Sequence, residues 1–73
     1  MNAQKFVAVV KESSFIAAEN AVLSYTAATS CRLVKESKNE FTVEFDGSDL
    51  DVNCLNRWLT AQGSRLLFWN FAN

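Results

Sequence analysis

Hydrophobic and polar positions along the chain fall into six blocks, of which four indicate strands and two indicate helices. The clearest strand is residues 40–45, where the apolar Phe41, Val43 and Phe45 alternate with polar residues. Successive side chains of a strand point to opposite sides of its sheet. We therefore expect these three side chains to face a core and the polar residues between them to face away.

An apolar, β-branched run at residues 6–10 predicts a first strand that is covered on both faces and is therefore central in its sheet. The same segment has a second interpretation, because Ala3, Phe6, Val7 and Val10 also recur at the spacing of a helix. The pattern leaves a central strand and an N-terminal helix both open.

A first helix is indicated after this segment. Ser13 or Ser14 is a suitable N-cap for an apolar stripe of helical spacing that begins at Phe15. The stripe continues to about Ala28, and no glycine marks its end.

The second helix is better marked. Ser48 followed by Asp51 resembles a capping box, and the apolar stripe after it continues to a glycine stop at Gly63. Between the two helices, residues 31–36 predict a strand, and the polar turn 37–39 joins it to the clearest strand as a hairpin.

The last block, residues 65–71, is short, aromatic and apolar. It is far shorter than the roughly 20 apolar residues that a membrane helix needs, and it predicts a fourth strand. Both faces of this strand are largely apolar, so one layer of helices cannot cover them all. Regular alternation would place Arg65, Leu67, Trp69 and Phe71 on one face and Leu66, Phe68 and Asn70 on the other.

The resulting order, β-α-β-β-α-β, predicts a ferredoxin-like α+β sandwich formed by a single domain over residues 1–73. Right-handed crossovers place the first and third strands at the centre of a four-stranded antiparallel sheet, with both helices on one face. The last strand then lies on an edge beside the first, and the other face of the sheet stays open.

Charge and hydropathy narrow the class of partner. Seven basic and eight acidic residues give a net charge of −1, so no basic field favours nucleic acid. Residues 38–45 are similar to the K/R-G-F/Y-G/A-F-V-x-F/Y motif of RNA-recognition domains, but they lack its glycines. The N-terminal apolar run is too short for a signal peptide or a membrane span, and we expect a cytoplasmic protein with reduced thiols.

Catalytic chemistry is poorly supplied, since the chain has no histidine to act as a general base at neutral pH. Cys31 and Cys54 lack CxxC spacing, and we expect small buried thiols that are reduced, with a disulfide as the lesser alternative. Asp46, Asp49 and Asp51 do not follow a calcium-loop spacing and suit helix caps better. The sequence therefore predicts a protein that is not an enzyme and binds neither metal nor cofactor.

The open face and the last strand remain as candidates for function, because an apolar centre with a charged rim is typical of a protein interface. The expected interface residues are Val7, Val9, Arg32, Val34, Leu67, Trp69 and Phe71. If the register of the last strand is shifted, Leu66 and Phe68 would replace Trp69 and Phe71 at its centre.

We expect the partner to be a protein, either a second copy of the chain as a homodimer or a larger assembly that it regulates or inhibits. Very small free-standing domains of this kind are often accessory or inhibitor proteins of phages and mobile elements, and we expect such a role here. The alternative is a small-molecule-sensing domain of the same fold, which would need a polar pocket at a junction of strand and helix.

Overall fold

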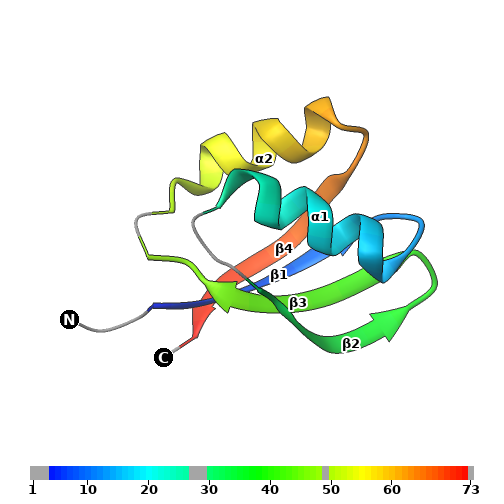
Figure 1. The fold of residues 1–73 in the computed structure, drawn as a ribbon, viewed down its shortest axis with the longest axis horizontal. Helices are drawn as coiled ribbons and strands as arrows, with labels where there is room; N and C mark the ends of the chain where they lie inside the picture. Colours follow the sequence, from blue (N-terminus) through cyan, green and yellow to red (C-terminus); the bar gives the residue numbers. More distant parts are fainter. Residues whose placement is uncertain (1–3, 27–29, 49, 73) are drawn as a thin grey trace.

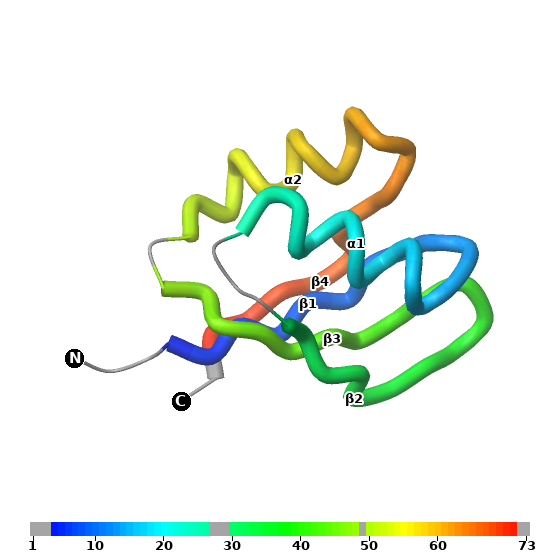
Figure 2. The backbone as a smooth tube through the Cα atoms, viewed as in Figure 1, coloured from blue at the N-terminus to red at the C-terminus, as the bar shows by residue number. Residues whose placement is uncertain are grey.

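The computed structural model describes residues 4–26, 30–48 and 50–72, which form a two-layer α+β sandwich (Figure 1). Its elements are β1 (Lys5–Lys11), α1 (Phe15–Tyr25), β2 (Arg32–Ser37), β3 (Glu40–Asp46), α2 (Val52–Ala61) and β4 (Arg65–Ala72). The four strands form one antiparallel sheet in the order β2-β3-β1-β4. Both helices lie on the same face of this sheet (Figure 2), so the predicted ferredoxin-like architecture is confirmed.

β1 lies at the centre of the sheet, between β3 and β4. Its Phe6, Ala8 and Val10 point toward the helices and are fully buried, whereas Val7 and Val9 point to the open face and are half-buried. The central-strand interpretation is confirmed and the alternative of an N-terminal helix is wrong, because strands on both sides of β1 pair with its backbone.

β3 has the one buried face that its alternation predicted. Phe41, Val43 and Phe45 are buried opposite the three buried residues of β1, while Thr42 and Glu44 face the open side. The helices complete the core with Ala18, Ala21 and Val22 from α1 and Leu55 and Leu59 from α2.

α1 starts where the sequence predicted and ends earlier. The Ser14 side chain caps the helix by accepting a hydrogen bond from the backbone N–H of Ala17 at 3.1 Å. The helix ends at Tyr25, because the β-branched Thr26 that follows has an extended backbone, with φ −89° and ψ 165°. The expected end near Ala28 is therefore too late, and Ala28 itself lies outside the described residues.

Asp51 caps α2, so the capping box that was predicted to start at Ser48 is wrong. The Asp51 carboxylate accepts hydrogen bonds from the backbone N–H groups of Asn53 and Cys54 at 3.0 and 3.2 Å. Ser48 instead donates its hydroxyl to the Asp46 carboxylate at 2.7 Å. A carboxylate directly before the first turn satisfies the free N–H groups of the helix and is favoured by its dipole.

β4 pairs antiparallel with β1 and contains a β-bulge. The register passes from the Val10–Leu66 pair to the Val9–Phe68 pair and leaves Leu67 without a partner. Directly opposed residues share a face of the sheet, so Leu66 lies on the helix side and Phe68 on the open side. The regular alternation that the sequence predicted for this strand is therefore wrong.

Phe45→Ala should destabilise the fold by about 3–5 kcal/mol, because Phe45 is 4% exposed and its ring lies 5.3 Å from that of Phe6. Glu44→Ala should cost about 1 kcal/mol or less, since Glu44 faces the open side and contacts two exposed cations. Urea or thermal unfolding of both variants measures the difference. Equal losses would contradict the assignment of a single buried face to β3.

Candidate functional site

β4 exposes three consecutive large apolar side chains, Leu67, Phe68 and Trp69, at 42, 58 and 44% of their surface. The bulge at Leu67 and the position of β4 at the sheet edge account for this exposure. An edge strand also presents backbone N–H and C=O groups that a further strand can pair with. β4 therefore combines apolar anchors with main-chain hydrogen-bonding groups.

Trp69 and Phe71 lie on the helix side of the sheet, whereas the sequence predicted them on the open side. Trp69 stacks on the buried ring of Phe6 with centroids 5.8 Å apart, and Phe71 meets the same ring edge-on at 5.0 Å. The cause is the extra residue at Leu67, which moves the later part of the strand by one position relative to its start. Trp69 consequently contacts the core through Phe6 while 44% of its own surface stays exposed.

The apolar centre of the open face is formed by Val7, Val9 and Phe68. Phe68 lies directly opposite Val9, and Val7 is the next residue of β1 on the same face. Sequence reasoning gave Phe68 only as part of an alternative pair with Leu66, and the bulge places these two residues on opposite faces. The signal for the bulge was hidden, because both possible faces of the strand are apolar.

The remaining predicted residues lie toward the opposite edge of the sheet. Val34 is 47% exposed at an irregularity in β2, the edge strand farthest from β4. Arg32 faces inward across the open face, with its Nε 3.3 Å from the Glu44 carboxylate. Lys5 approaches the same carboxylate at 3.8 Å. Val34 is thus separate from the Phe68 patch, and the open face is more charged than expected.

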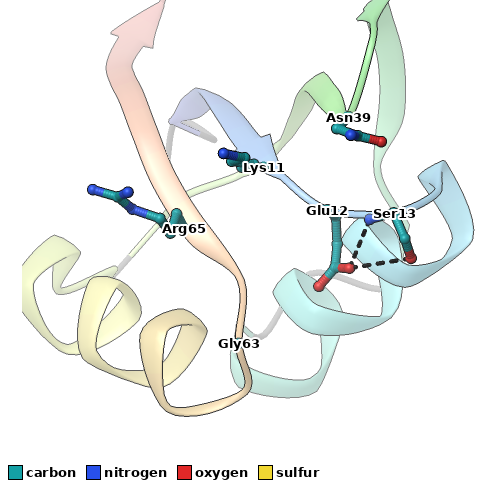
Figure 3. Close-up of a pocket in the computed structure, with 6 residues that line it drawn as sticks. All are labelled: Lys11, Glu12, Ser13, Asn39, Gly63 and Arg65. Atoms are coloured by element: carbon teal, nitrogen blue, oxygen red, sulfur yellow. Dashed lines mark hydrogen bonds between the residues drawn. The ribbon is translucent and has the colours of Figure 1, made fainter.

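A pocket of about 270 Å³, lined mainly by polar and charged residues, lies at the junction of β1 and α1 (Figure 3). Asn39 and Gly63 line it from the turns before β3 and β4, and both have the left-handed backbone, with φ of 60° and 86°. The predicted helix stop at Gly63 is confirmed. The other lining residues are Lys11, Glu12, Ser13 and Arg65.

Glu12 is held in this pocket by the protein itself. Its carboxylate accepts hydrogen bonds from the hydroxyl of the buried Ser64 and from the backbone N–H of Ser13 at 2.8 Å. These hydrogen bonds lower the pKa of the Glu12 carboxyl, and the bond from Ser64 has the largest effect. Figure 3 shows the Glu12 side chain directed toward the helices. The side chains of Lys11 and Arg65 extend in a common direction, away from Glu12.

The two cysteines are free thiols that are half-buried, less covered than the sequence predicted. The Cys31 sulfur lies 3.8 Å from the Glu19 carboxylate, and burial together with this charge raises the pKa of Cys31 to about 11. A nucleophilic cysteine needs a lowered pKa. The surroundings of Cys31 therefore oppose a catalytic role for it.

The acidic residues near α2 have structural partners. Asp46 bonds Ser48 and Asp51 caps the helix, while Asp49 lies outside the described residues. Within the described ranges, no group of three or more histidine, cysteine, aspartate or glutamate side chains is placed to hold a metal ion. No helix in the same ranges is long and apolar enough to cross a membrane.

Glu12→Gln should reduce stability at neutral pH and make stability less sensitive to acid. The lowered pKa means that ionised Glu12 stabilises the fold above its unfolded pKa, and this contribution is lost as the pH falls through the folded value. Unfolding midpoints measured from pH 7 to pH 3 test this expectation. Parallel curves for the two proteins would show that the Ser64 bond adds nothing to stability.

In a Cys54→Ser variant, Cys31 should be alkylated at pH 8 about 10-fold more slowly than free cysteine. A pKa near 11 lowers the thiolate fraction about 100-fold, and the greater nucleophilicity of a more basic thiolate offsets about 10-fold of this. Glu19→Gln should raise the rate of alkylation.

Wild-type protein denatured without reductant should titrate two thiols, and finding none would establish a disulfide.

The exposed edge of β4, the Val7–Val9–Phe68 patch and the β1–α1 pocket are thus the three surface features with functional potential in the described chain. Comparison of the chain with known protein families, with curated proteins and with solved structures found no match.

Proposed function

We propose that this protein is a small protein-binding module that holds its partner at the edge strand β4 and the adjoining open face of the sheet. The proposal rests on one observation, the exposure of Leu67, Phe68 and Trp69 in sequence on an edge strand. A strand of the partner would pair with β4 through main-chain hydrogen bonds, and its side chains would contact these anchors on both faces.

The composition of β4 supports an occupant. Proteins usually protect an exposed edge with charge, proline or a covering segment, because an apolar edge pairs with other chains. The chain contains no proline, and Arg65 is the one charged residue of β4. An apolar edge of eight residues with so little protection would promote aggregation of a protein without a partner. In a protein that binds a partner, the same edge serves as the binding surface.

The proposal includes a role without catalysis and a cytoplasmic location, where free thiols stay reduced. The partner is a second copy of the chain or a protein that this module regulates or inhibits. A role as an accessory protein of phage or mobile-element type is supported by the small size of the chain and not by any particular residue.

Small-molecule sensing is a second candidate function, and the pocket at the β1–α1 junction favours it. Lys11 and Arg65 would attract an acidic ligand, although Glu12 brings a negative charge to the same pocket. A ligand that binds there at free concentration L should raise the melting temperature, because it stabilises the folded state by RT ln(1 + L/Kd). The edge-strand function predicts no such small ligand.

Phe68→Ser should weaken partner association by about 2 kcal/mol or more, roughly 30-fold in Kd, because it removes the central aromatic anchor. The fold should persist, since Phe68 is one of the most exposed apolar residues. The measurement is affinity capture from source cells and sedimentation of the purified protein. Trp69→Ala is less selective, because Trp69 also packs on Phe6.

Ile16→Ser is the matched control, because Ile16 is 67% exposed on α1, away from β4. This variant should capture the same partner as the wild type. Equal capture by Phe68→Ser, with its melting temperature unchanged, would contradict the proposed role of β4.

A further inference from the structure

Positive charge is concentrated on the open face of the sheet, although the whole chain has a net charge of −1. The strand register places five basic and three acidic residues on this face, an excess of two positive charges. The rest of the chain, with two basic and five acidic residues, has an excess of three negative charges. The charged residues of the open face are Lys5, Lys11, Arg32, Lys35, Arg65, Glu40, Glu44 and Asp46.

Two of the three acidic residues on this face are already engaged. Glu44 lies between Lys5 and Arg32, at 3.8 and 3.3 Å. Asp46 accepts hydrogen bonds from the backbone N–H and the hydroxyl of Ser48 at 3.0 and 2.7 Å. The third, Glu40, lies directly opposite Lys11 but forms no ion pair with a residue in the described ranges. One carboxylate is thus left on the face against its three other cations.

Three cations of the open face, Lys11, Lys35 and Arg65, form no ion pair with any residue in the described ranges. Arg65 lies directly opposite Lys11, at the end of β4 that precedes Phe68. Lys35 lies across the sheet, beside a shallow hollow of about 220 Å³ that also borders Val9. The apolar patch around Phe68 is therefore flanked by unpaired positive charge.

We infer that the segment docking at β4 is an extended, acidic stretch of a partner protein. Its backbone pairs with β4, one apolar side chain covers Phe68 and Val9, and its carboxylates reach Arg65 and Lys11. This inference rests on the proposed function and specifies the chemistry of the partner. Complementary charge of this kind raises the rate of association and selects among partners.

Two other occupants fit the face less well. Pairing β4 with β4 of a second copy would join two sheets that each have an excess of positive charge, with Arg65 of both copies near the seam. Single-stranded nucleic acid binds to successive aromatic platforms, and among the described residues of this face Phe68 is the one aromatic side chain. Neither a second copy nor a nucleic acid strand complements both the positive charge and the apolar patch of this face.

The test uses two labelled peptides of about 10 residues, long enough to pair with the whole of β4. Each has a centre of alternating valine and threonine, and the ends are glutamates in one peptide and glutamines in the other. Fluorescence anisotropy with the full chain gives the two affinities. The glutamate peptide should bind about 10-fold more tightly than the glutamine peptide at low salt, and the ratio should fall as salt is added.

Arg65→Gln should weaken binding of the glutamate peptide about 3- to 5-fold, as expected for one exposed charge pair, and should leave the glutamine peptide unaffected. Arg57→Gln is the matched control, because it makes the same change of net charge on α2. Its affinities should stay within about 2-fold of wild type for both peptides. Melting curves of both variants verify that the fold is unchanged.

The outcomes separate this inference from the function on which it rests. If both peptides bind equally and Phe68→Ser abolishes their binding, the inference of an acidic partner is overturned, whereas the proposed binding at the edge strand is supported. A dimer in sedimentation that Phe68→Ser dissociates, with neither peptide bound, would identify a second copy as the occupant and overturn the inference. Tighter binding of a thymidine oligonucleotide than of the glutamate peptide would also overturn it.

Discussion

The contacts of the Phe6 ring are the constraint on which the arrangement of β3, β1 and β4 depends. The ring is fully buried, and its neighbours are Phe45 on one side and Trp69 and Phe71 on the other, with centroids between 5.0 and 5.8 Å away. Space at this point is limited, since a Cβ atom added at Gly47 would lie 2.6 Å from the Cβ of Phe6. The end of β4 is thereby fixed against β1.

The other end of β4 is fixed by a polar contact, the hydrogen bond from Ser64 to Glu12. Between these two fixed points the β4 side contains one residue more than the β1 side, since Phe71 pairs with Phe6 and Ser64 bonds to Glu12. The surplus appears as the bulge at Leu67. The core and the buried hydroxyl together therefore determine which side chains of β4 reach the surface.

The sequence predicted the fold and the faces of β3 because one-sided burial leaves a clear alternation at Phe41, Val43 and Phe45. It could not predict the faces of β4, where apolar residues occupy both sides and a one-residue slip changes nothing in the pattern. The excess of positive charge on the open face was hidden for a related reason, because it depends on the cross-strand register. Asp51 was recognised as suited to a helix cap, but Ser48 was preferred as the N-cap because it offered an equally good local signal.

The pairing of β1 with β4 also has a kinetic consequence. These strands are neighbours in the sheet, but both helices and the β2–β3 hairpin lie between them along the chain. Pairing a central strand with so distant a segment raises the contact order of the fold, and folding becomes slower as contact order rises. Until it pairs with β1, β4 is an apolar segment without a strand partner. The folding chain can therefore associate with other chains through the same residues that the folded protein exposes at its edge.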